Sequence, residues 1–432
     1  MKNKLILFLS LIFLILYTIN IISAQPSGSL SIKSIQNGTL TLGTNPTNVG
    51  INSVNMSQTF TICYWGTTSS NANQAVTCNL TSSTNLRVQA GIAGAAIVVS
   101  WFAVEFESGA SVQRGNTSWA TATASQNITI SSVNLTKTFV IVGTNTTSTS
   151  QTIDEQRITR AVLTNSTNLQ LIRVETGIAV NTFWQVVELN NVTVQNGTTT
   201  LSSAASATAS INSVNTSDTF LVFSTSGAAA TNGVDAEYYV RGRFVDPTTI
   251  NFSRASATNS ATVSWFAVSV DGAKVQNGTS TAATTQVNLY SVLNAINLSR
   301  ASAFLSSNGG TTGTADQDSL TWKAMFPNST AINVSRQSTQ SLLSNVDWFV
   351  IEWPVAAAPG PDSCTCTDGA SWTIINGDQC TLSTTCNLGA NPLRIWDGAL
   401  RITSSGSLNA QGCYIQNAES LYVISGGKLI CR

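Results

Sequence analysis

The stretch Trp101-Phe102-Ala103-Val104-Glu105 decides the fold, because it returns three more times at nearly constant spacing. Successive tryptophans are 83, 81 and 83 residues apart. Each copy is rich in the β-branched and aromatic residues that favour strands. The sequence therefore predicts four tandem β repeats. The later copies are Trp184-Gln185-Val186-Val187-Glu188, Trp265-Phe266-Ala267-Val268-Ser269 and Trp348-Phe349-Val350-Ile351-Glu352.

Two further markers occur in the same order in every repeat. One is a Val-Gln-x-Gly type motif at Ile35–Gly38, Val112–Gly115, Val194–Gly197 and Val275–Gly278. The other is an Asn-x-Ser/Thr motif whose asparagines are 79, 81 and 82 residues apart. Three ordered markers place repeats at 25–109, 110–191, 192–273 and 274–353. The asparagines are Asn55, Asn134, Asn215 and Asn297.

Each repeat is predicted to be all-β. Short apolar runs such as Phe139–Val142 and Phe220–Phe223 are bounded by Ser, Thr, Asn and Gly, and no sustained helical period is present. About 80 residues with several short strands is typical of a small antiparallel sandwich. We expect four such sandwiches, arranged in tandem as beads or a stiff rod.

The recurring Trp strand has two distinct faces. Alternation places Phe102, Val104 and Phe106 on one side and Trp101 with Glu105 on the other. The first side is the better core face. The tryptophans then either pack a second apolar layer or the junction between repeats, or form aromatic platforms for a sugar ring beside a carboxylate. The glycan-binding candidates are Trp101, Trp184, Trp265, Trp348, Glu188 and Glu352.

A pair of basic residues flanks a predicted hairpin turn in three repeats. The pairs are Arg160 with Arg173, Arg241 with Arg254 and Lys323 with Arg336. Like charges opposite each other across a sheet need a carboxylate or a ligand between them. Either Glu188 and Glu352 complete a structural ion cluster, or the pairs capture an acidic glycan. Repeat 1 instead carries Cys63 and Cys78 on strands that we expect to be adjacent and disulfide-bonded.

The repeats resemble a known lectin family. The order of a Phe-centred strand, an Arg-bearing hairpin and a final strand such as Val263-Ser264-Trp265-Phe266-Ala267-Val268 is similar to the H-type lectin domain. That resemblance implies a six-stranded antiparallel sandwich that binds sugars such as N-acetylgalactosamine and associates through its strands. It identifies no particular sugar-binding residue here. The repeats also resemble those of uncharacterised exported microbial surface proteins.

The composition excludes several classes of function. The chain has 432 residues, 20 basic against 20 acidic side chains and no histidine. Zero net charge argues against nucleic acid as a partner. The absence of histidine removes Ser-His-Asp and Cys-His nucleophile systems and His-ligated metal sites. We predict no enzyme activity, no cofactor and no metal.

The first residues indicate export. Lys2 and Lys4 precede the apolar run Leu5–Tyr17, and a small-residue exit ends at Ala24. This order is typical of a secretory signal peptide over 1–24, although the segment also approaches the length of a membrane anchor. Sixteen Asn-x-Ser/Thr sequons agree with export, and we expect glycosylation at the four equivalent asparagines. No transmembrane helix is expected after cleavage of the signal.

The C-terminal part has a different composition. A Pro/Ala linker over 354–362 leads to a region, 363–432, whose very short alternating strands, such as Leu393–Ile395, Leu400–Ile402 and Leu421–Val423, are separated by Gly turns. This rhythm predicts a short β-solenoid, either capped by its disulfides or needing a partner at an open edge. Export favours disulfides over zinc for its six cysteines, with their pairing open. They are Cys364, Cys366, Cys380, Cys386, Cys413 and Cys431.

Function follows from these expectations. Acidic and basic residues of the solenoid, namely Asp378, Asp397, Arg394 and Arg401, are the types found in polysaccharide lyases, but two or three coils are too short for the usual groove. We expect a secreted, cell-surface structural or adhesion protein, part of an extracellular coat or filament. The alternative is a multivalent carbohydrate binder that gains avidity from four weak sites. Expected partners are other cell-surface proteins, copies of itself and, as a further candidate, glycans.

Overall fold

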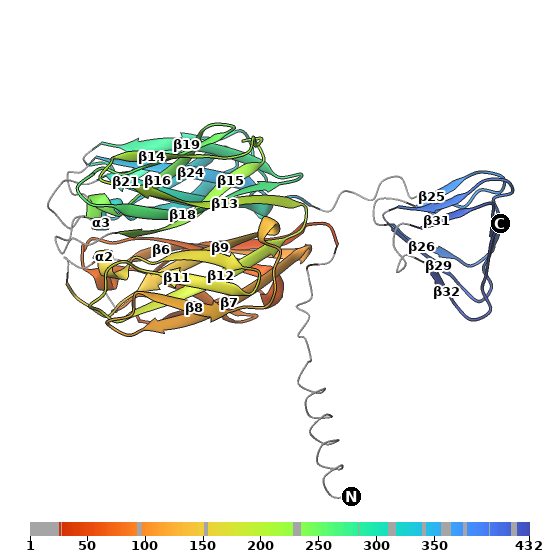
Figure 1. Ribbon diagram of the computed structural model, residues 1–432, viewed down its shortest axis with the longest axis horizontal. Coiled ribbons are helices and arrows are strands. Elements are labelled where there is room, and N and C mark those ends of the chain that lie inside the picture. The colour runs from red at the N-terminus through yellow and green to blue at the C-terminus, as the bar shows by residue number, and fades with distance from the viewer. Residues whose placement is uncertain are drawn as a thin grey trace, which may run out of the picture. The chain divides into compact units, whose positions relative to one another are not determined.

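The computed structural model describes residues 26, 28–92, 97–150, 154–227, 235–283, 285–309, 317–338, 343–355, 364–374, 378–396, 398–415 and 421–432. The expected signal peptide and most of the expected linker lie outside these residues. The chain forms two compact units, Met1–Pro354 and Val355–Arg432. The first holds the four repeats and the second holds the short alternating strands (Figure 1).

Each repeat is an antiparallel sandwich, as the patterns predict, and it contains six strands. Its first, sixth and third strands form one sheet, here called the long sheet, and its second, fifth and fourth strands form the short sheet. Repeat 1 comprises β1 (Ser31–Thr41), β2 (Thr47–Gly50), η1 (Met56–Gln58), β3 (Thr59–Gly66), η2 (Ala72–Gln74), β4 (Thr77–Ser82), β5 (Asn85–Gln89) and β6 (Val98–Ser108). Repeat 2 comprises β7 (Ala110–Trp119), β8 (Ser125–Thr129), η3 (Leu135–Lys137), β9 (Thr138–Asn145), α2 (Asp154–Arg157), β10 (Arg160–Asn165), β11 (Asn168–Ile172) and β12 (Val180–Leu189).

The other two repeats follow the same strand order, with a short helix before the fourth strand in both and before the third strand in repeat 4. Repeat 3 comprises β13 (Val192–Leu201), β14 (Ser206–Ser210), β15 (Thr219–Gly227), η4 (Asp235–Glu237), β16 (Arg241–Asp246), β17 (Thr249–Ser253) and β18 (Ala261–Val270). Repeat 4 comprises β19 (Lys274–Ala282), β20 (Asn288–Val292), η5 (Leu298–Arg300), β21 (Ala301–Gly309), α3 (Gln317–Leu320), β22 (Lys323–Asn328), β23 (Ala331–Ser335) and β24 (Ser344–Glu352).

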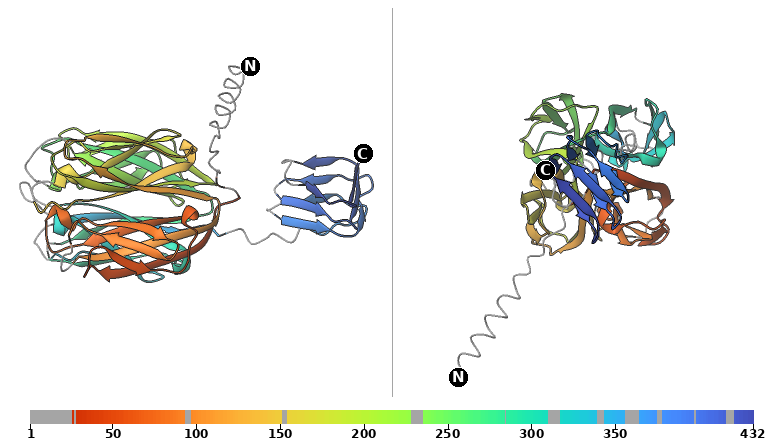
Figure 2. Two further views of the ribbon diagram at one scale, coloured as in Figure 1. Left: turned by 90° about the horizontal axis from the view of Figure 1, so that it is seen from below. Right: turned by 90° about the vertical axis from the view of Figure 1, so that its right-hand side faces the viewer.

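The four repeats close into a ring, so the expected beads or rod are wrong. The fourth strand of each repeat packs on the third and sixth strands of the next: β4 on β9 and β12, β10 on β15 and β18, β16 on β21 and β24. The fourth strand of repeat 4, β22, returns to β3 and β6 of repeat 1. The end-on view in Figure 2 shows the repeats placed around a common axis. One apolar core is shared by residues of all four repeats.

An aromatic cluster fills one end of this axis. Phe60, Phe139, Phe220 and Trp353 come from repeats 1, 2, 3 and 4 in turn. Their ring centroids are 6.0, 5.9, 5.6 and 5.7 Å apart around the cluster, which closes from Trp353 back to Phe60. All four side chains are fully buried. We call these residues the axial cluster; it ties every repeat to its two neighbours in the ring.

Polar bonds set the register at each junction. The Gln185 side chain accepts the N–H of Thr61 at 2.9 Å and donates to its carbonyl at 2.8 Å. It thereby satisfies both backbone groups of this residue on the edge strand β3. Ser224 and Ser306 accept backbone N–H groups from the preceding repeats. At the closing junction, the Tyr64 hydroxyl accepts the N–H of Leu305 at 2.7 Å.

The Trp-bearing sixth strands are buried on both faces. The Phe102 and Phe106 face lies in the core shared between repeats, whereas Trp101 and Ala103 belong to the sandwich core of repeat 1 itself. The face of β6 that was expected to pack inside repeat 1 therefore packs against the neighbouring repeats instead. Ring closure explains why, because it covers the outer side of every long sheet.

The C-terminal unit is a three-coil parallel β-solenoid, as predicted. Three parallel sheets run through its coils, and the inward-facing Leu, Ile and Trp side chains form a separate core. Figure 2 shows these coils from the side. β31, β32 and β33 are the edge strands of the three sheets in the last coil, and Tyr414, Tyr422 and Val423 are exposed there. The strands are β25 (Trp372–Ile374), β26 (Asp378–Leu382), β27 (Thr385–Asn387), β28 (Leu393–Ile395), β29 (Gly398–Ile402), β30 (Ser407–Ala410), β31 (Cys413–Ile415), β32 (Leu421–Val423) and β33 (Lys428–Cys431).

Four disulfides join the eight cysteines. Cys63 on β3 is bonded to Cys78 on β4, which links the two sheets of repeat 1. In the solenoid unit, two disulfides tie the segment before the first coil to that coil, and the third closes the last coil. These are Cys364–Cys380, Cys366–Cys386 and Cys413–Cys431.

Candidate functional site

The repeated tryptophans lie inside the repeats and form no exposed platform for a sugar. Trp101, Trp184, Trp265 and Trp348 are 7%, 9%, 6% and 6% exposed. Each lies opposite the Gly of the Val-Gln-x-Gly marker on the neighbouring strand. The Trp265 indole N–H donates to Thr199 at 3.0 Å, and equivalent bonds hold Trp184 and Trp348. The sugar-platform interpretation is therefore corrected to a structural one.

The packing of Trp265 on Gly197 leaves no room for a methyl group. A Cβ at Gly197 would lie 2.6 Å from the indole, so we expect Gly197→Ala to destabilise the four-repeat unit by about 1–3 kcal/mol through overpacking. The matched control is Gly50→Ala, where nothing lies within 4 Å of the added Cβ. Urea unfolding followed by tryptophan fluorescence measures both. Equal midpoints for the two variants would contradict this packing.

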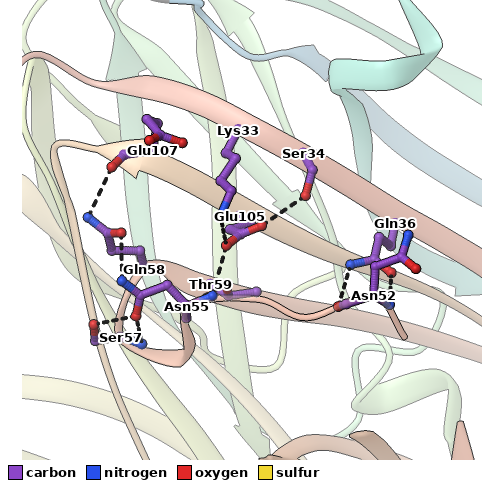
Figure 3. A network of polar contacts seen from close by, with 10 residues as sticks. All are labelled: Lys33, Ser34, Gln36, Asn52, Asn55, Ser57, Gln58, Thr59, Glu105 and Glu107. Atoms are coloured by element: carbon purple, nitrogen blue, oxygen red, sulfur yellow. Dashed lines mark hydrogen bonds and ion pairs between the residues drawn. The ribbon is translucent and has the colours of Figure 1, made fainter. Parts of the chain in front are cut away.

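The glutamates at the ends of the sixth strands hold the loop that carries the sequon. Glu105 accepts the backbone N–H of Asn55 at 2.8 Å and bonds to Lys33 and Ser34, as Figure 3 shows. Glu188 and Glu352 accept the N–H groups of Asn134 and Asn297 at 2.9 and 3.1 Å. Burial raises the pKa of Glu188. In their repeats these carboxylates are buried and accept hydrogen bonds from the backbone.

The four sequon asparagines are exposed and take part in the same turn. Asn55 Oδ1 accepts both the N–H of Ser57 at 3.1 Å and its hydroxyl at 2.8 Å (Figure 3). Asn134, Asn215 and Asn297 repeat this arrangement. The Gln of the Val-Gln-x-Gly marker holds the loop that leads to the sequon. The Gln36 side chain both donates to and accepts from the backbone of Asn52. All three repeated markers thus have a role in building the repeat.

The basic pairs separate into two structural roles and form no shared cluster. Arg160 pairs with Ile172 across the hairpin, so Arg173 is one residue beyond and on the other face. Arg160 donates to Ser226 and Ser264 of repeat 3, and Arg241 forms an ion pair with Asp347 of repeat 4 at 3.1 Å. Lys323 donates to Gln337 within repeat 4. The first members of the pairs in repeats 2 and 3 are therefore junction residues.

The second members are buried arginines that hold loops through backbone carbonyls. Arg173 is fully buried and donates to five carbonyl oxygens, at 2.7–3.2 Å. Arg254 and Arg336 bind equivalent carbonyls in repeats 3 and 4. Burial lowers the pKa of all three guanidinium groups. Because Glu188 and Glu352 are engaged at the sequon loops, the expected ion cluster with these glutamates is not formed.

The structure reveals a cavity that the sequence patterns did not predict. It has a volume of about 330 Å³ and is lined by residues of all four repeats. The third strands pass from fully buried residues near the axial cluster to half-buried residues that line the cavity. These half-buried residues are 63–65, 141–143, 223–225 and 305–307. We call this space the axial cavity.

Three of the four acidic and basic residues singled out in the solenoid lie on different strands, two of them in one sheet and the third in another. Asp378 begins β26, Arg394 lies on β28 over the Tyr414 ring at 5.8 Å, and Arg401 is exposed on β29. Asp397 lies outside the described residues.

No protein family model matches the sequence, and a search of curated proteins gives no match. Within the described residues, helices of the length and hydropathy required to span a bilayer are absent.

Proposed function

We propose that the chain is an exported, N-glycosylated surface protein that acts in adhesion or as a structural element of an extracellular coat or filament. One observation carries the proposal: an exposed asparagine occupies the same turn of all four repeats, while the equivalent Trp and Glu side chains are buried. The four disulfides support an oxidising compartment. The carbohydrate-binding alternative loses its aromatic platforms, because those tryptophans pack inside the repeats.

Mapping of occupied glycosylation sites tests export. The motifs at Asn145 and Asn333 also fit the sequon, but these side chains are 2% and 6% exposed and serve as internal controls. We expect glycan at Asn55, Asn134, Asn215 and Asn297 and none at the two buried positions. Glycosidase treatment in water labelled with heavy oxygen, which marks each released site as a labelled Asp, followed by mass spectrometry reads each site separately. Four unmodified asparagines in protein from its native source would overturn this part of the proposal.

Electron microscopy of protein released from the native cell surface tests the structural role. We expect ordered sheets or filaments in negative stain, with a matching assembly mass by light scattering. Dispersed single molecules of monomer mass would instead contradict a coat or filament. A glycan array would then be the next measurement.

A further inference from the structure

A second set of exposed sequons lies on the first strand of every repeat. Of the sixteen sequons, only two sets have a member in the same element of all four repeats. One is the set of sequon turns described above, here called the turn set. We call the other the strand set; each of its asparagines is exposed, and so is the Ser or Thr that completes each sequon. Its members are Asn37 on β1, Asn116 on β7, Asn196 on β13 and Asn277 on β19.

Strand pairing places the strand set on one face of these first strands. Each asparagine lies directly opposite a phenylalanine of the sixth strand. In repeat 2 the residue before the marker glycine is Arg114, and the sequon is found two residues further along, on the same face. The opposed pairs are Asn37 with Phe102, Asn116 with Phe183, Asn196 with Phe266 and Asn277 with Phe349.

The fold gives no reason for asparagine at these positions. Asn55 and its equivalents accept hydrogen bonds inside their turns, which accounts for the turn set. No hydrogen bond joins a side-chain amide of the strand set to another described residue. Asparagine is also depleted in β-strands. Its recurrence on the first strand of four diverged repeats therefore points to the sequon itself as the retained feature.

The strand set lies where neighbouring repeats meet. β7 contacts η1, β13 contacts η3 and β1 contacts η5, so each first strand meets the sequon turn of the preceding repeat. On β19, the N–H of Val275 donates to the carbonyl of Ser217 in the sequon turn of repeat 3 at 2.6 Å. In repeat 2, Arg114 donates to the carbonyls of Met56 and Thr59. Every junction thus brings together one turn sequon and one strand sequon from different repeats.

We propose that the strand set carries N-linked glycans, so that two glycosylated asparagines lie at every junction of the ring. The inference rests on the proposed export of the chain. The co-reactant is an oligosaccharide joined through its anomeric carbon to a lipid diphosphate, used by a transferase of the exporting cell. The Asn Nδ2 forms a bond to that carbon and the carbon–oxygen bond to the diphosphate breaks. The amide proton leaves with the diphosphate.

Site mapping of protein from its native source tests the inference. Glycosidase release in water labelled with heavy oxygen converts each glycosylated asparagine to a labelled Asp. We expect label at all four asparagines of the strand set and none at the buried Asn145 and Asn333. Label in the turn set with none in the strand set would overturn this inference and leave the proposed function standing. Absence of label from both sets would overturn both.

Two variants of Thr198 test whether the sequon directs the modification. Thr198 completes the sequon of Asn196 and is exposed, so its replacement leaves the core intact. In the full chain secreted by cells that perform N-glycosylation, Thr198→Val should remove the glycan from Asn196, whereas Thr198→Ser should keep it. Equal urea midpoints of the deglycosylated variants confirm that both fold. An unmodified Asn196 in the unaltered chain, or a glycan that persists in Thr198→Val, would contradict the assignment.

Discussion

Replacement of Trp353 by Ala should unfold the four repeats together rather than one at a time. The Trp353 side chain is fully buried and packs edge-on against Phe60 and Phe106 of repeat 1 and Phe220 of repeat 3. Its indole N–H also donates to the buried Ser302 hydroxyl at 2.8 Å. Loss of this ring removes contacts at three repeats, so we expect about 3–5 kcal/mol of destabilisation.

Guanidinium unfolding followed by near-ultraviolet circular dichroism measures the effect of Trp353→Ala. A single transition that shifts as a whole indicates one cooperative unit. Trp396→Ala is the control, since Trp396 is 49% exposed in the solenoid unit and its removal should change stability by less than about 0.5 kcal/mol. A variant in which one part of the transition moves and the rest stays would show that the repeats fold separately.

Replacement of Arg173 by Met should be comparably damaging, for a different physical reason. The guanidinium satisfies the carbonyls of 120, 121, 123, 156 and 178, and it lies over the Trp119 ring at 5.3 Å. Methionine keeps much of the apolar volume but donates nothing, so several buried acceptors lose their partner. We expect a loss of about 3–5 kcal/mol.

The Arg173→Lys variant separates charge from geometry. An ammonium group keeps the charge but reaches fewer carbonyls than the planar guanidinium fork, so its stability should lie between that of Arg173→Met and the unaltered protein. Arg243→Met controls for the substitution itself, because Arg243 is exposed on β16. If Arg173→Met unfolds at the same denaturant concentration as Arg243→Met, the carbonyl bonds contribute nothing to stability.

The strand pattern could be predicted because it depends on local alternation. Strands expected at Leu393–Ile395 and Leu421–Val423 occur at those residues, and the one expected at Leu400–Ile402 lies within Gly398–Ile402. Ring closure was missed, although a signal for it exists in the sequence. The run from Val98 to Phe106 is apolar at nearly every position, which is typical of a strand buried on both faces, as found for β6. A bead exposed on its outer side would show stricter alternation.

The roles of the charged residues could not be predicted, because their partners are backbone atoms. Glu105 binds the N–H of Asn55, and Arg173 binds carbonyls from two loops and from the short helix α2. Every residue carries such groups, so a sequence gives no sign of which ones a side chain will meet. The axial cavity is harder still to foresee, since its volume is set by how four junctions with different side chains fit together.

Closure of the ring also fixes copy number. In an open array, gene duplication can add or delete a unit, because each unit meets only its neighbours and the new end resembles the old one. Here β22 must reach β3 and β6, and Trp353 must reach Phe60, so a chain of three or five units would leave that seam unmatched. Length variation between related genes should therefore fall outside the ring. The same constraint lets the four copies diverge, because each has only one possible position in the circle.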